Sequence, residues 1–186
     1  MQNIIDILPN AIRLETYVKG NAVDLSVTPV DSFAFGRENA PLALETHDEV
    51  PCFFLHEEGY FGAIKVSFQE AIDGKIVNLL GEALKENGLD GERLHVIMGP
   101  CLTFPHCPVE PEVFDEVTKK YLPACKVTSG THYIDVPLIC LLQFRALGAK
   151  MENIRIGDYD TFENASLLYS QKRGEENENV TLATLL

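Results

Sequence analysis

The sequence predicts a mixed α/β or α+β fold, a mixed β-sheet covered by helices, in one domain of residues 1–186. Segments rich in branched and aromatic residues alternate with segments of helical periodicity, which favours strands interleaved with helices. The stretch HEEGY at 56–60 predicts a hairpin turn between two of the strands. A hydrophobic content of 46% in 186 residues is enough for a buried core, and we find no internal repeat and no low-complexity linker.

Six segments have the composition that is typical of β-strands, with many branched and aromatic residues. In chain order, the predicted strands are 41–46, 50–56, 60–68, 93–98, 153–158 and 165–170. Because helical segments separate several of them and a hairpin joins two, the sheet is expected to contain both parallel and antiparallel neighbours.

Helical periodicity is clearest in 70–87, where apolar residues recur at spacings of three and four. Gly88 follows in the position of a C-cap. We therefore expect an amphipathic helix that lies on the sheet. The residues expected to pack on the sheet are Ile72, Ile76, Leu79 and Leu80.

Two further helices are predicted. Segment 111–121 has one apolar face, and Pro111 suits its first turn. Segment 137–147 is apolar nearly all round and ends at Gly148, so we expect it to be the most buried helix.

Composition excludes several classes of partner. Acidic residues exceed basic ones by 28 to 15, and a formal net charge of −13 argues against a nucleic-acid polymer, whose binding needs clustered Lys and Arg. No apolar run approaches the ~20 residues of a membrane helix, and the N-terminus has no signal-peptide pattern. The five cysteines fit no disulfide framework. We expect a cytoplasmic protein with reduced thiols and no membrane partner, and the oligomeric state stays open.

The residues alone give only weak signals for chemistry, since there is no phosphate-binding glycine loop, paired Cys-x-x-Cys or His-Glu-x-x-His motif. Cys101, His106 and Cys107 have metal-compatible side chains but lack paired zinc-site spacing, so buried thiols beside a loop histidine are the preferred interpretation. Cys52 with His47 or His56 would suit a nucleophile and its base. A single cysteine within a strand is more often a small core residue.

Segments spread over most of the chain carry a resemblance, through their order and near-matching spacing. They are YVKG at 17–20, VDSFAFGRENAPLALETHDEVP at 30–51, GAIKVSFQEAIDGKIV at 62–77, MGPCLTFPHCPVEPEV at 98–113, HYIDVPLICLLQFRALGAKMENIRIGD at 132–158 and DTFENASLLYSQKR at 160–173. The chain thereby resembles the YfiH-like family, also called the laccase-domain or polyphenol oxidase family, as a divergent member with a shortened N-terminal segment. The resemblance implies the YfiH-like fold and, for the family, purine nucleoside phosphorylase and adenosine deaminase activity.

The resemblance also implies a site, and this chain departs from the family there. In the family a zinc ion is held by His, Cys and His, and the matching positions here are Lys19, Glu49 and Lys65. The arginine of the last zinc-ligand stretch is matched by Gln69. The closing Ser-Tyr-Arg-Arg is matched by SQKR at 170–173, which keeps two basic residues. The candidate ligand-binding residues are thus Gln69, Lys172 and Arg173.

Zinc does not suit the substituted positions. A zinc site needs imidazole, thiolate or carboxylate donors, whereas a lysine at neutral pH is a cation without a free lone pair. We therefore expect no metal and no cofactor at this site. Two lysines and one glutamate carry the same net charge as zinc with one thiolate, so they could persist as a salt-bridged cluster. Most clusters of this kind are structural or surface ion pairs rather than ligand sites.

The leading hypothesis is a divergent family member that has lost zinc-dependent phosphorolysis and deamination and retains at most a small-molecule pocket. One alternative is an active enzyme on purine nucleosides in which Lys19 and Lys65 bind phosphate or act as base and Glu49 orients them. Another is a protein-interaction module with an acidic surface. The candidate ligands are a purine nucleoside or phosphate. Asp135 and Thr161 also match family positions, and we expect capping or loop hydrogen bonds from them.

Overall fold

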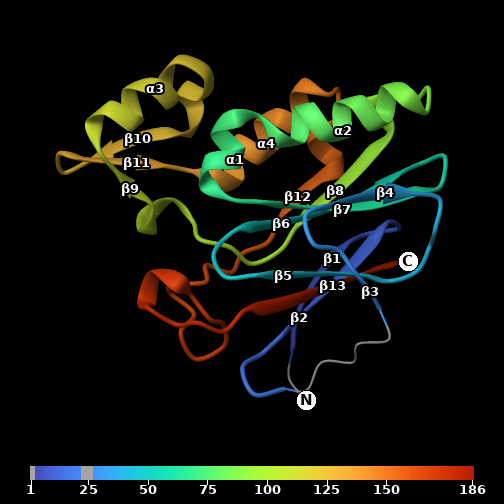
Figure 1. The fold of residues 1–186 in the computed structure, drawn as a ribbon, viewed down its shortest axis with the longest axis horizontal. Helices are drawn as coiled ribbons and strands as arrows, with labels where there is room; N and C mark the ends of the chain where they lie inside the picture. The colour runs from blue at the N-terminus through green and yellow to red at the C-terminus, as the bar shows by residue number, and fades with distance from the viewer. Residues whose placement is uncertain (1–2, 22–26) are drawn as a thin grey trace.

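A computed structural model describes residues 3–21 and 27–186, in which one sheet lies between a layer of helices and a second sheet (Figure 1). The middle sheet has the strand order β12-β8-β6-β7-β4. Its strands are β4 (Phe33–Gly36), β6 (Val50–His56), β7 (Tyr60–Val66), β8 (Leu94–Met98) and β12 (Ile154–Ile156). Strands β12 and β8 run parallel and the other neighbours run antiparallel, so the mixed α/β fold is confirmed.

The middle sheet is buried on both faces, which explains the nearly continuous apolar run of β6. Cys52 and Phe54 point to the core under the helices, whereas Phe53 between them points to the core against the second sheet. The hairpin between β6 and β7 turns at Gly59, whose φ of 81° suits a residue without a Cβ atom. The turn predicted at 56–60 is therefore confirmed.

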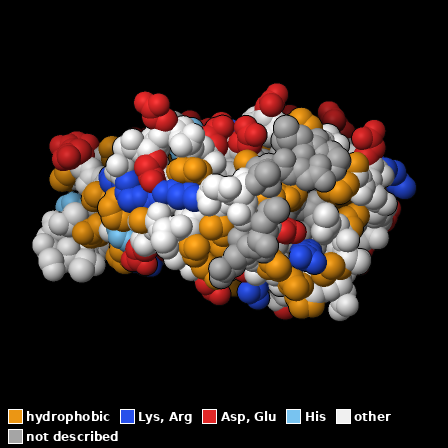
Figure 2. All heavy atoms as spheres, turned by 90° about the horizontal axis from the view of Figure 1, so that it is seen from below, with side chains coloured by type: hydrophobic (Ala, Val, Ile, Leu, Met, Phe, Trp, Pro, Cys, Tyr) orange, Lys and Arg blue, Asp and Glu red, His pale blue; other side chains and the backbone are white. Residues whose placement is uncertain are grey.

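The second sheet has the order β1-β2-β13-β5-β3. Its strands are β1 (Asn3–Leu8), β2 (Ile12–Tyr17), β3 (Thr28–Pro29), β5 (Leu42–Thr46) and β13 (Asn179–Leu185). Figure 2 views the molecule from the side of this sheet and shows hydrophobic side chains among acidic and basic ones. In the edge strand β1, Ile5 and Ile7 are 49% and 43% exposed.

Most of the second sheet was not predicted. Only β5 was expected. Strand β2 alternates apolar and polar residues and was missed, whereas inward-facing polar side chains interrupt the apolar alternation of β1 and β13. In β13, Asn179 and Thr181 point inward and are buried. The Thr181 hydroxyl lies 2.9 Å from that of Thr16 on β2, so the two polar groups satisfy each other.

The predicted helix of 70–87 is two helices, α1 (Phe68–Asp73) and α2 (Lys75–Glu86). Ser67 and Glu70 form a capping box that begins α1, and Gly74, with φ of 83°, separates the two helices. Three of the four residues expected on the sheet are buried there, but Leu79 is 37% exposed. The helical face turns at the break, so Leu84 rather than Leu79 continues the buried stripe.

The other two helices lie where they were predicted, as α3 (Pro111–Tyr121) and α4 (Val136–Ala146). Helix α4 is buried along much of its length and covers the middle sheet together with α1 and α2 (Figure 1). Helix α3 lies beside a small sheet in the order β10-β11-β9. Its strands are β9 (Pro108–Val109), β10 (Cys125–Thr128) and β11 (Thr131–Ile134). Among the described helices, none has the length and apolar character to cross a membrane.

The strand predicted at 165–170 is wrong. This segment consists of turns, with the amides of Leu167 and Leu168 both donating to the Asn164 carbonyl. Leu168 is fully buried, which accounts for the apolar composition that suggested a strand. The short helix η5 (Gln171–Arg173) follows.

Candidate functional site

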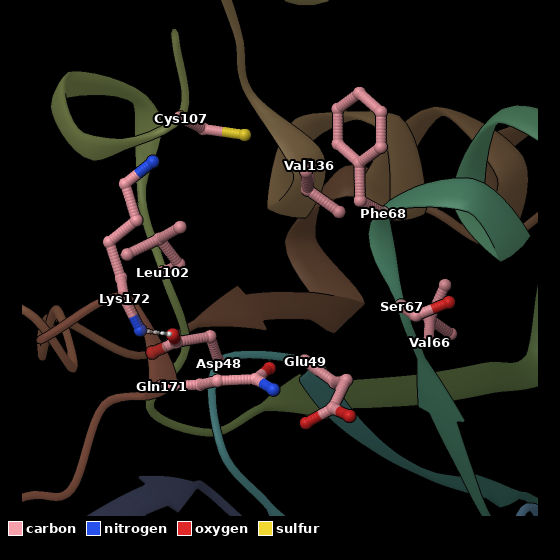
Figure 3. A pocket seen from close by; sticks show the side chains of 10 residues that line it. All are labelled: Asp48, Glu49, Val66, Ser67, Phe68, Leu102, Cys107, Val136, Gln171 and Lys172. Atoms are coloured by element: carbon pink, nitrogen blue, oxygen red, sulfur yellow. Dashed lines mark hydrogen bonds between the residues drawn. The ribbon is translucent and has the colours of Figure 1, made fainter. Parts of the chain in front are cut away.

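A cavity of about 420 Å³ lies where the turn between β5 and β6, the end of β7, the start of α4 and the helix η5 meet (Figure 3). Its walls combine apolar side chains with a few polar ones. The apolar wall consists of Val66, Phe68, Leu102 and Val136, together with the thiol side chain of Cys107. The polar lining residues are Asp48, Glu49, Ser67, Gln171 and Lys172.

Asp48 fixes the turn between β5 and β6 against the C-terminal part of the chain. Its carboxylate accepts hydrogen bonds from the hydroxyl of Thr161 at 2.6 Å, the hydroxyl of Ser170 at 3.1 Å and the amide of Lys172 at 2.8 Å. The loop hydrogen bond expected of Thr161 is thus confirmed. Because these three donors occupy the Asp48 carboxylate, the residue shapes the cavity and has little capacity left for a ligand.

The three positions that match the family's zinc ligands line three different cavities. Glu49 lines the cavity just described, and its Oε2 accepts from the His47 amide at 2.8 Å. Lys65 lines a second cavity of about 460 Å³, where its Nζ donates to the Glu45 carbonyl at 2.9 Å. Lys19 lines a third cavity, beside Tyr17 and Tyr169.

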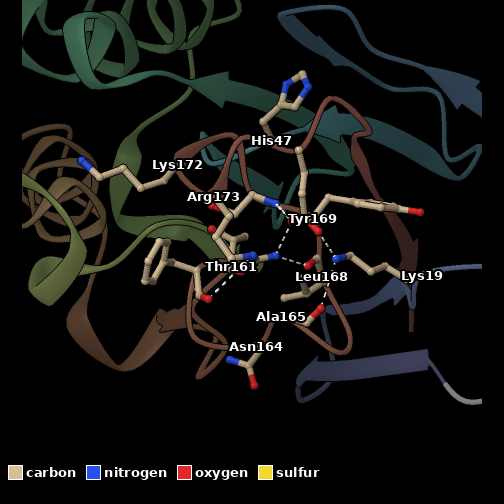
Figure 4. A network of polar contacts seen from close by, with 12 residues as sticks. Lys19, His47, Thr161, Asn164, Ala165, Leu168, Tyr169, Lys172 and Arg173 are labelled. Carbon is tan, nitrogen blue, oxygen red and sulfur yellow. Dashed lines mark hydrogen bonds and ion pairs between the residues drawn. The ribbon is translucent and has the colours of Figure 1, made fainter.

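The predicted salt-bridged cluster is wrong. Within residues 3–21 and 27–186, neither Lys19 nor Lys65 has an ion pair with Glu49. Lys19 pairs instead with Glu175 and donates to the Ala165 carbonyl at 3.0 Å (Figure 4). The two lysines thus have separate partners: Lys19 is paired with a carboxylate, whereas Lys65 is hydrogen-bonded to a backbone carbonyl.

Glu175 is the centre of a polar network that sequence reasoning missed. Its carboxylate accepts from Lys19, from the Ser170 amide at 2.9 Å and from the Arg173 guanidinium at 2.5 Å. The hydrogen bond from Lys19 is the largest cause that lowers the pKa of Glu175 to about 2, with further contributions from Ser170 and Arg173. The carboxylate is therefore ionised at neutral pH and ties the segment after β2 to the loop before β13.

The Arg173 guanidinium is hydrogen-bonded to acceptors within the protein. Its two terminal guanidinium nitrogens donate to the carbonyls of Thr161, Phe162 and Leu168, besides the Glu175 carboxylate (Figure 4). All four hydrogens on those nitrogens are used in this way. The geometry therefore assigns Arg173 to holding the loop of residues 160–168 and argues against the ligand-binding role that was predicted.

Of the other two predicted ligand-binding residues, Lys172 lines the cavity and Gln69 does not. Gln69 donates to the Asp73 carboxylate at 3.1 Å on the helix surface and is not among the residues that line the cavity. Lys172 does line the cavity, and its side chain runs along one wall toward Cys107 (Figure 3). In the part of the chain that the structure describes, its ammonium has no hydrogen-bond or ion-pair partner.

The loop of Cys101, His106 and Cys107 is held by a buried carboxylate. Asp160 accepts from the Thr103 amide at 2.7 Å and lies 3.2 Å from Nδ1 of His106. Burial alone would raise the pKa of Asp160, but hydrogen bonds outweigh it and hold the pKa below its usual value. The largest of these contributions comes from the Thr103 hydroxyl at 2.5 Å, followed by the amides of Glu163 and Thr103 and by His106. Burial raises the pKa of Cys107 to about 11, so its thiol stays protonated at neutral pH.

The remaining candidates have structural roles. Cys52 is fully buried in β6, and burial raises the pKa of its thiol well above the usual value, which argues against a nucleophile. The ring of His47 contacts the Glu176 carbonyl at 3.0 Å rather than a thiol. Asp135 caps α4 by accepting from the Leu138 amide at 3.1 Å, as expected.

The layers, strand order and cavity define a mixed α/β domain with a cavity of about 420 Å³ at the ends of its strands. The family model described as multi-copper polyphenol oxidoreductase laccase matches residues 10–184. The chain belongs to this family, and the resemblance to YfiH-like proteins is confirmed. A comparison with curated proteins gives no match.

Solved structures show the same fold at low sequence identity. The chain is 17% identical to the hypothetical protein YfiH of Bacillus licheniformis, with a TM-score of 0.73 over 84% of this chain and 62% of that one. YlmD of Geobacillus stearothermophilus is 21% identical, with the same TM-score and coverage. The Neisseria meningitidis protein NMB0706, of the family model DUF152, is 18% identical with a TM-score of 0.69 over 87% and 67%. The chain thus spans 62% of the length of the first two proteins.

The residues at the inherited positions do not fit a zinc ion. Two of the three side chains are ammonium groups that already donate to protein oxygens, and Glu49 is the only donor of the three. Copper, which the family description names, prefers imidazole, thiolate or thioether donors, and these positions offer none. Over the described residues, no three His, Cys, Asp or Glu side chains are grouped so that they could hold a metal ion.

Proposed function

We propose that this chain is a family member that has lost zinc-dependent phosphorolysis and deamination of purine nucleosides and keeps a small-molecule pocket beside Glu49. The proposal rests on which residues occupy the three positions that match the family's zinc ligands, and on where their side chains lie. Lysines occupy two of them, and all three side chains line separate cavities with partners of their own. Without a metal, the water activation on which such chemistry relies has no source at this site.

The cavity beside Glu49 supports the retained pocket. It has the mixed character of a ligand site, with an apolar wall and few polar groups, and its volume falls within the range of roughly 300–1,000 Å³ that small-molecule pockets span. Glu49 and Lys172 bring an accepting carboxylate and a free ammonium to it. A purine nucleoside and inorganic phosphate are the first ligands to test.

The alternative of an active enzyme that uses Lys19 and Lys65 together has less support. Lys19 is paired with Glu175 and Lys65 is bound to a carbonyl, so neither presents a free ammonium to a shared substrate. No particular observation favours the protein-interaction module.

Metal analysis and turnover test the proposal. Protein purified with zinc in the buffers is expected to carry no stoichiometric zinc and to convert neither inosine nor adenosine. The triple variant Lys19→His, Glu49→Cys, Lys65→His is expected to take up more zinc than the parent, because the number of donors rises from one to three and two positive charges are lost. A Lys119→His, Lys120→His variant, altered at exposed positions on α3, controls for added histidines. Stoichiometric zinc in the parent that disappears when Lys19, Glu49 and Lys65 are changed to alanine would contradict the proposal.

A further inference from the structure

We propose that the cavity beside Glu49 binds a linear ω-amino acid, an unbranched hydrocarbon chain with a carboxylate at one end and an ammonium at the other. The carboxylate pairs with Lys172 and the ammonium pairs with Glu49. This inference rests on the proposed function, because it assigns a ligand class to the pocket that remains. It follows from three properties of the lining: a cation at one end, an acceptor at the other end, and apolar side chains between them.

The cationic group is Lys172. Its backbone amide donates to the Asp48 carboxylate at 2.8 Å, which anchors the residue at the cavity wall. The side chain extends along that wall toward Cys107 (Figure 3). Lys172 is exposed, so a ligand can reach its ammonium, which has no partner among the described residues. Such an ammonium attracts a carboxylate through a charge-assisted hydrogen bond.

The anionic group is Glu49, on the turn between β5 and β6. The residue is partly buried, and its Oε2 accepts from the His47 amide at 2.8 Å. Within residues 3–21 and 27–186, no protein group donates to Oε1, so this oxygen can accept from a ligand ammonium. Asp48 does not compete for that ammonium, because three protein donors occupy its carboxylate.

The two charged groups lie at different ends of the cavity. Figure 3 shows the Lys172 ammonium toward Cys107 and Glu49 at the opposite end. One molecule can contact both only if its own charges are separated as well. An α-amino acid cannot do so, because its two charged groups share one carbon atom. An ω-amino acid carries them at the two ends of its chain.

The lining between the charged groups determines the body of the ligand. Val66, Phe68, Leu102 and Val136 present hydrocarbon there. Methylene groups covered by these side chains gain the free energy of their burial. A peptide or sugar unit at the same place would lose hydration of its polar groups and find few partners. The wall therefore favours plain hydrocarbon between the two charges.

Other ligand classes satisfy only part of this lining. A neutral purine nucleoside leaves the Lys172 ammonium without an anion. An apolar carboxylate pairs with Lys172 but has no donor for Glu49, and an apolar amine has the opposite defect. Inorganic phosphate pairs with Lys172 and leaves the apolar wall uncovered. A chain with opposite charges at its two ends matches all three parts of the site.

Calorimetric titration of the full chain tests the assignment. The ligands are 4-aminobutanoate, 5-aminopentanoate and 6-aminohexanoate, a series in which the two charges move apart. The matched control is L-leucine, an isomer of 6-aminohexanoate that carries both charges on one carbon. Hexanoate lacks the ammonium and hexylamine lacks the carboxylate. Inosine and inorganic phosphate are titrated beside them.

Two variants remove one charge each from the cavity. Lys172→Gln and Glu49→Gln keep side chains that form hydrogen bonds. Lys150→Gln and Glu152→Gln are the matched controls, because both residues are exposed and neither lines the cavity. Thermal unfolding verifies that each variant is folded. The comparison compounds test the same two contacts on the parent protein, independently of the variants.

We expect at least one ω-amino acid to bind, and L-leucine, hexanoate and hexylamine to bind at least about tenfold more weakly. Lys172→Gln and Glu49→Gln are each expected to lose about tenfold or more in affinity for that ligand, and the two control variants are expected to match the parent.

Three results would overturn the assignment while leaving a small-molecule pocket. They are equal binding of L-leucine, hexanoate or hexylamine, tighter binding of inosine or phosphate than of every ω-amino acid, and unchanged affinity in either Lys172→Gln or Glu49→Gln. Absence of binding by all three ω-amino acids overturns it as well. Stoichiometric zinc in the parent would overturn the proposed function instead, so the two failures are distinguishable.

Discussion

By resemblance, Lys19 and Lys65 match positions where the family has a histidine, and a lysine differs from a histidine in both the charge and the reach of its side chain. Lys19 extends to Glu175 and the Ala165 carbonyl, and Lys65 extends to the Glu45 carbonyl. Each ammonium thus has protein acceptors of its own. The sequence cannot predict that the substituted charges separate, because the partners of Lys19 are up to 156 residues away in the chain.

Contacts between residues far apart in the chain also decide which site residues could be predicted. Glu49 and Lys172 were found from their positions in matched motifs, and both line the cavity. Asp48 was adjacent to a matched position, yet its role depends on Ser170 and Thr161, which lie more than a hundred residues further on. Chain proximity gives no information about such contacts.

The lowered pKa of Glu175 predicts how the stability of the protein depends on pH. Its folded pKa of about 2 lies below its ordinary value of 4.5, so its stabilising effect is complete above pH 4.5 and is lost as the pH falls toward 2. The parent is therefore expected to lose stability across this range, and Glu175→Gln is expected to lose less because it cannot be protonated there. Urea unfolding at a series of pH values measures both slopes. Parallel slopes for parent and variant would show that other carboxylates account for the whole effect.

At the scale of elements, the division between α1 and α2 depends on contacts that the sequence partly reveals. The capping box of Ser67 and Glu70 is visible as a sequence pattern. The break at Gly74 is harder to predict, because the apolar spacing continues across it. Gln143 of α4 supports the break: its Oε1 accepts from the Ile76 amide at 3.0 Å and its Nε2 donates to the Ala71 carbonyl at 2.7 Å. A buried side chain from a helix that is distant in sequence thus bridges the end of α1 and the start of α2.

Gly74→Ala tests the break. A Cβ atom at Gly74 would meet only ordinary contacts at 3.9 Å, so its cost comes from the left-handed backbone conformation, with φ of 83°. We expect a loss of about 1–2 kcal/mol in the free energy of unfolding. Gly36→Ala in β4 is the matched control, because a Cβ atom there has open space and φ is outside the left-handed region. A loss of equal size in both variants would show that strain at Gly74 is not the cause.

At the scale of the whole molecule, the two large sheets differ in how far the sequence predicts them. The middle sheet was largely predicted, because a sheet covered on both faces has nearly continuous apolar strands such as β6. The second sheet has one face toward that sheet, and its strands β1 and β13 carry polar residues on this inner side, so their apolar alternation is weak. Its central strand β13 comes from the C-terminal end of the chain and pairs with both β2 and β5. Pairing across the whole chain is set by tertiary contacts rather than by local pattern.

Asp6 lies between the two sheets, and its environment predicts how its replacement would change the stability of the protein. It points inward from β1 and is buried, 3.5 Å from the Arg155 guanidinium on β12. Burial is the main cause that raises the pKa of Asp6, with Asp158 adding to it and Arg155 offsetting part of it. The ionised carboxylate is therefore less favourable in the folded state than in the unfolded chain.

Asp6→Asn is expected to stabilise the protein at neutral pH, by on the order of 1 kcal/mol, because it removes a buried charge and keeps an oxygen that can accept from Arg155. For a raised pKa, the contribution to stability is complete below the ordinary value of 3.8 and is lost as the pH rises through the folded pKa. The advantage of the variant should therefore shrink as the pH approaches about 4. Thermal unfolding at both pH values measures it, and Asp115→Asn, at an exposed position on α3, is the control. A variant that is less stable than the parent at neutral pH would mean that the ion pair between the sheets outweighs the burial of the charge.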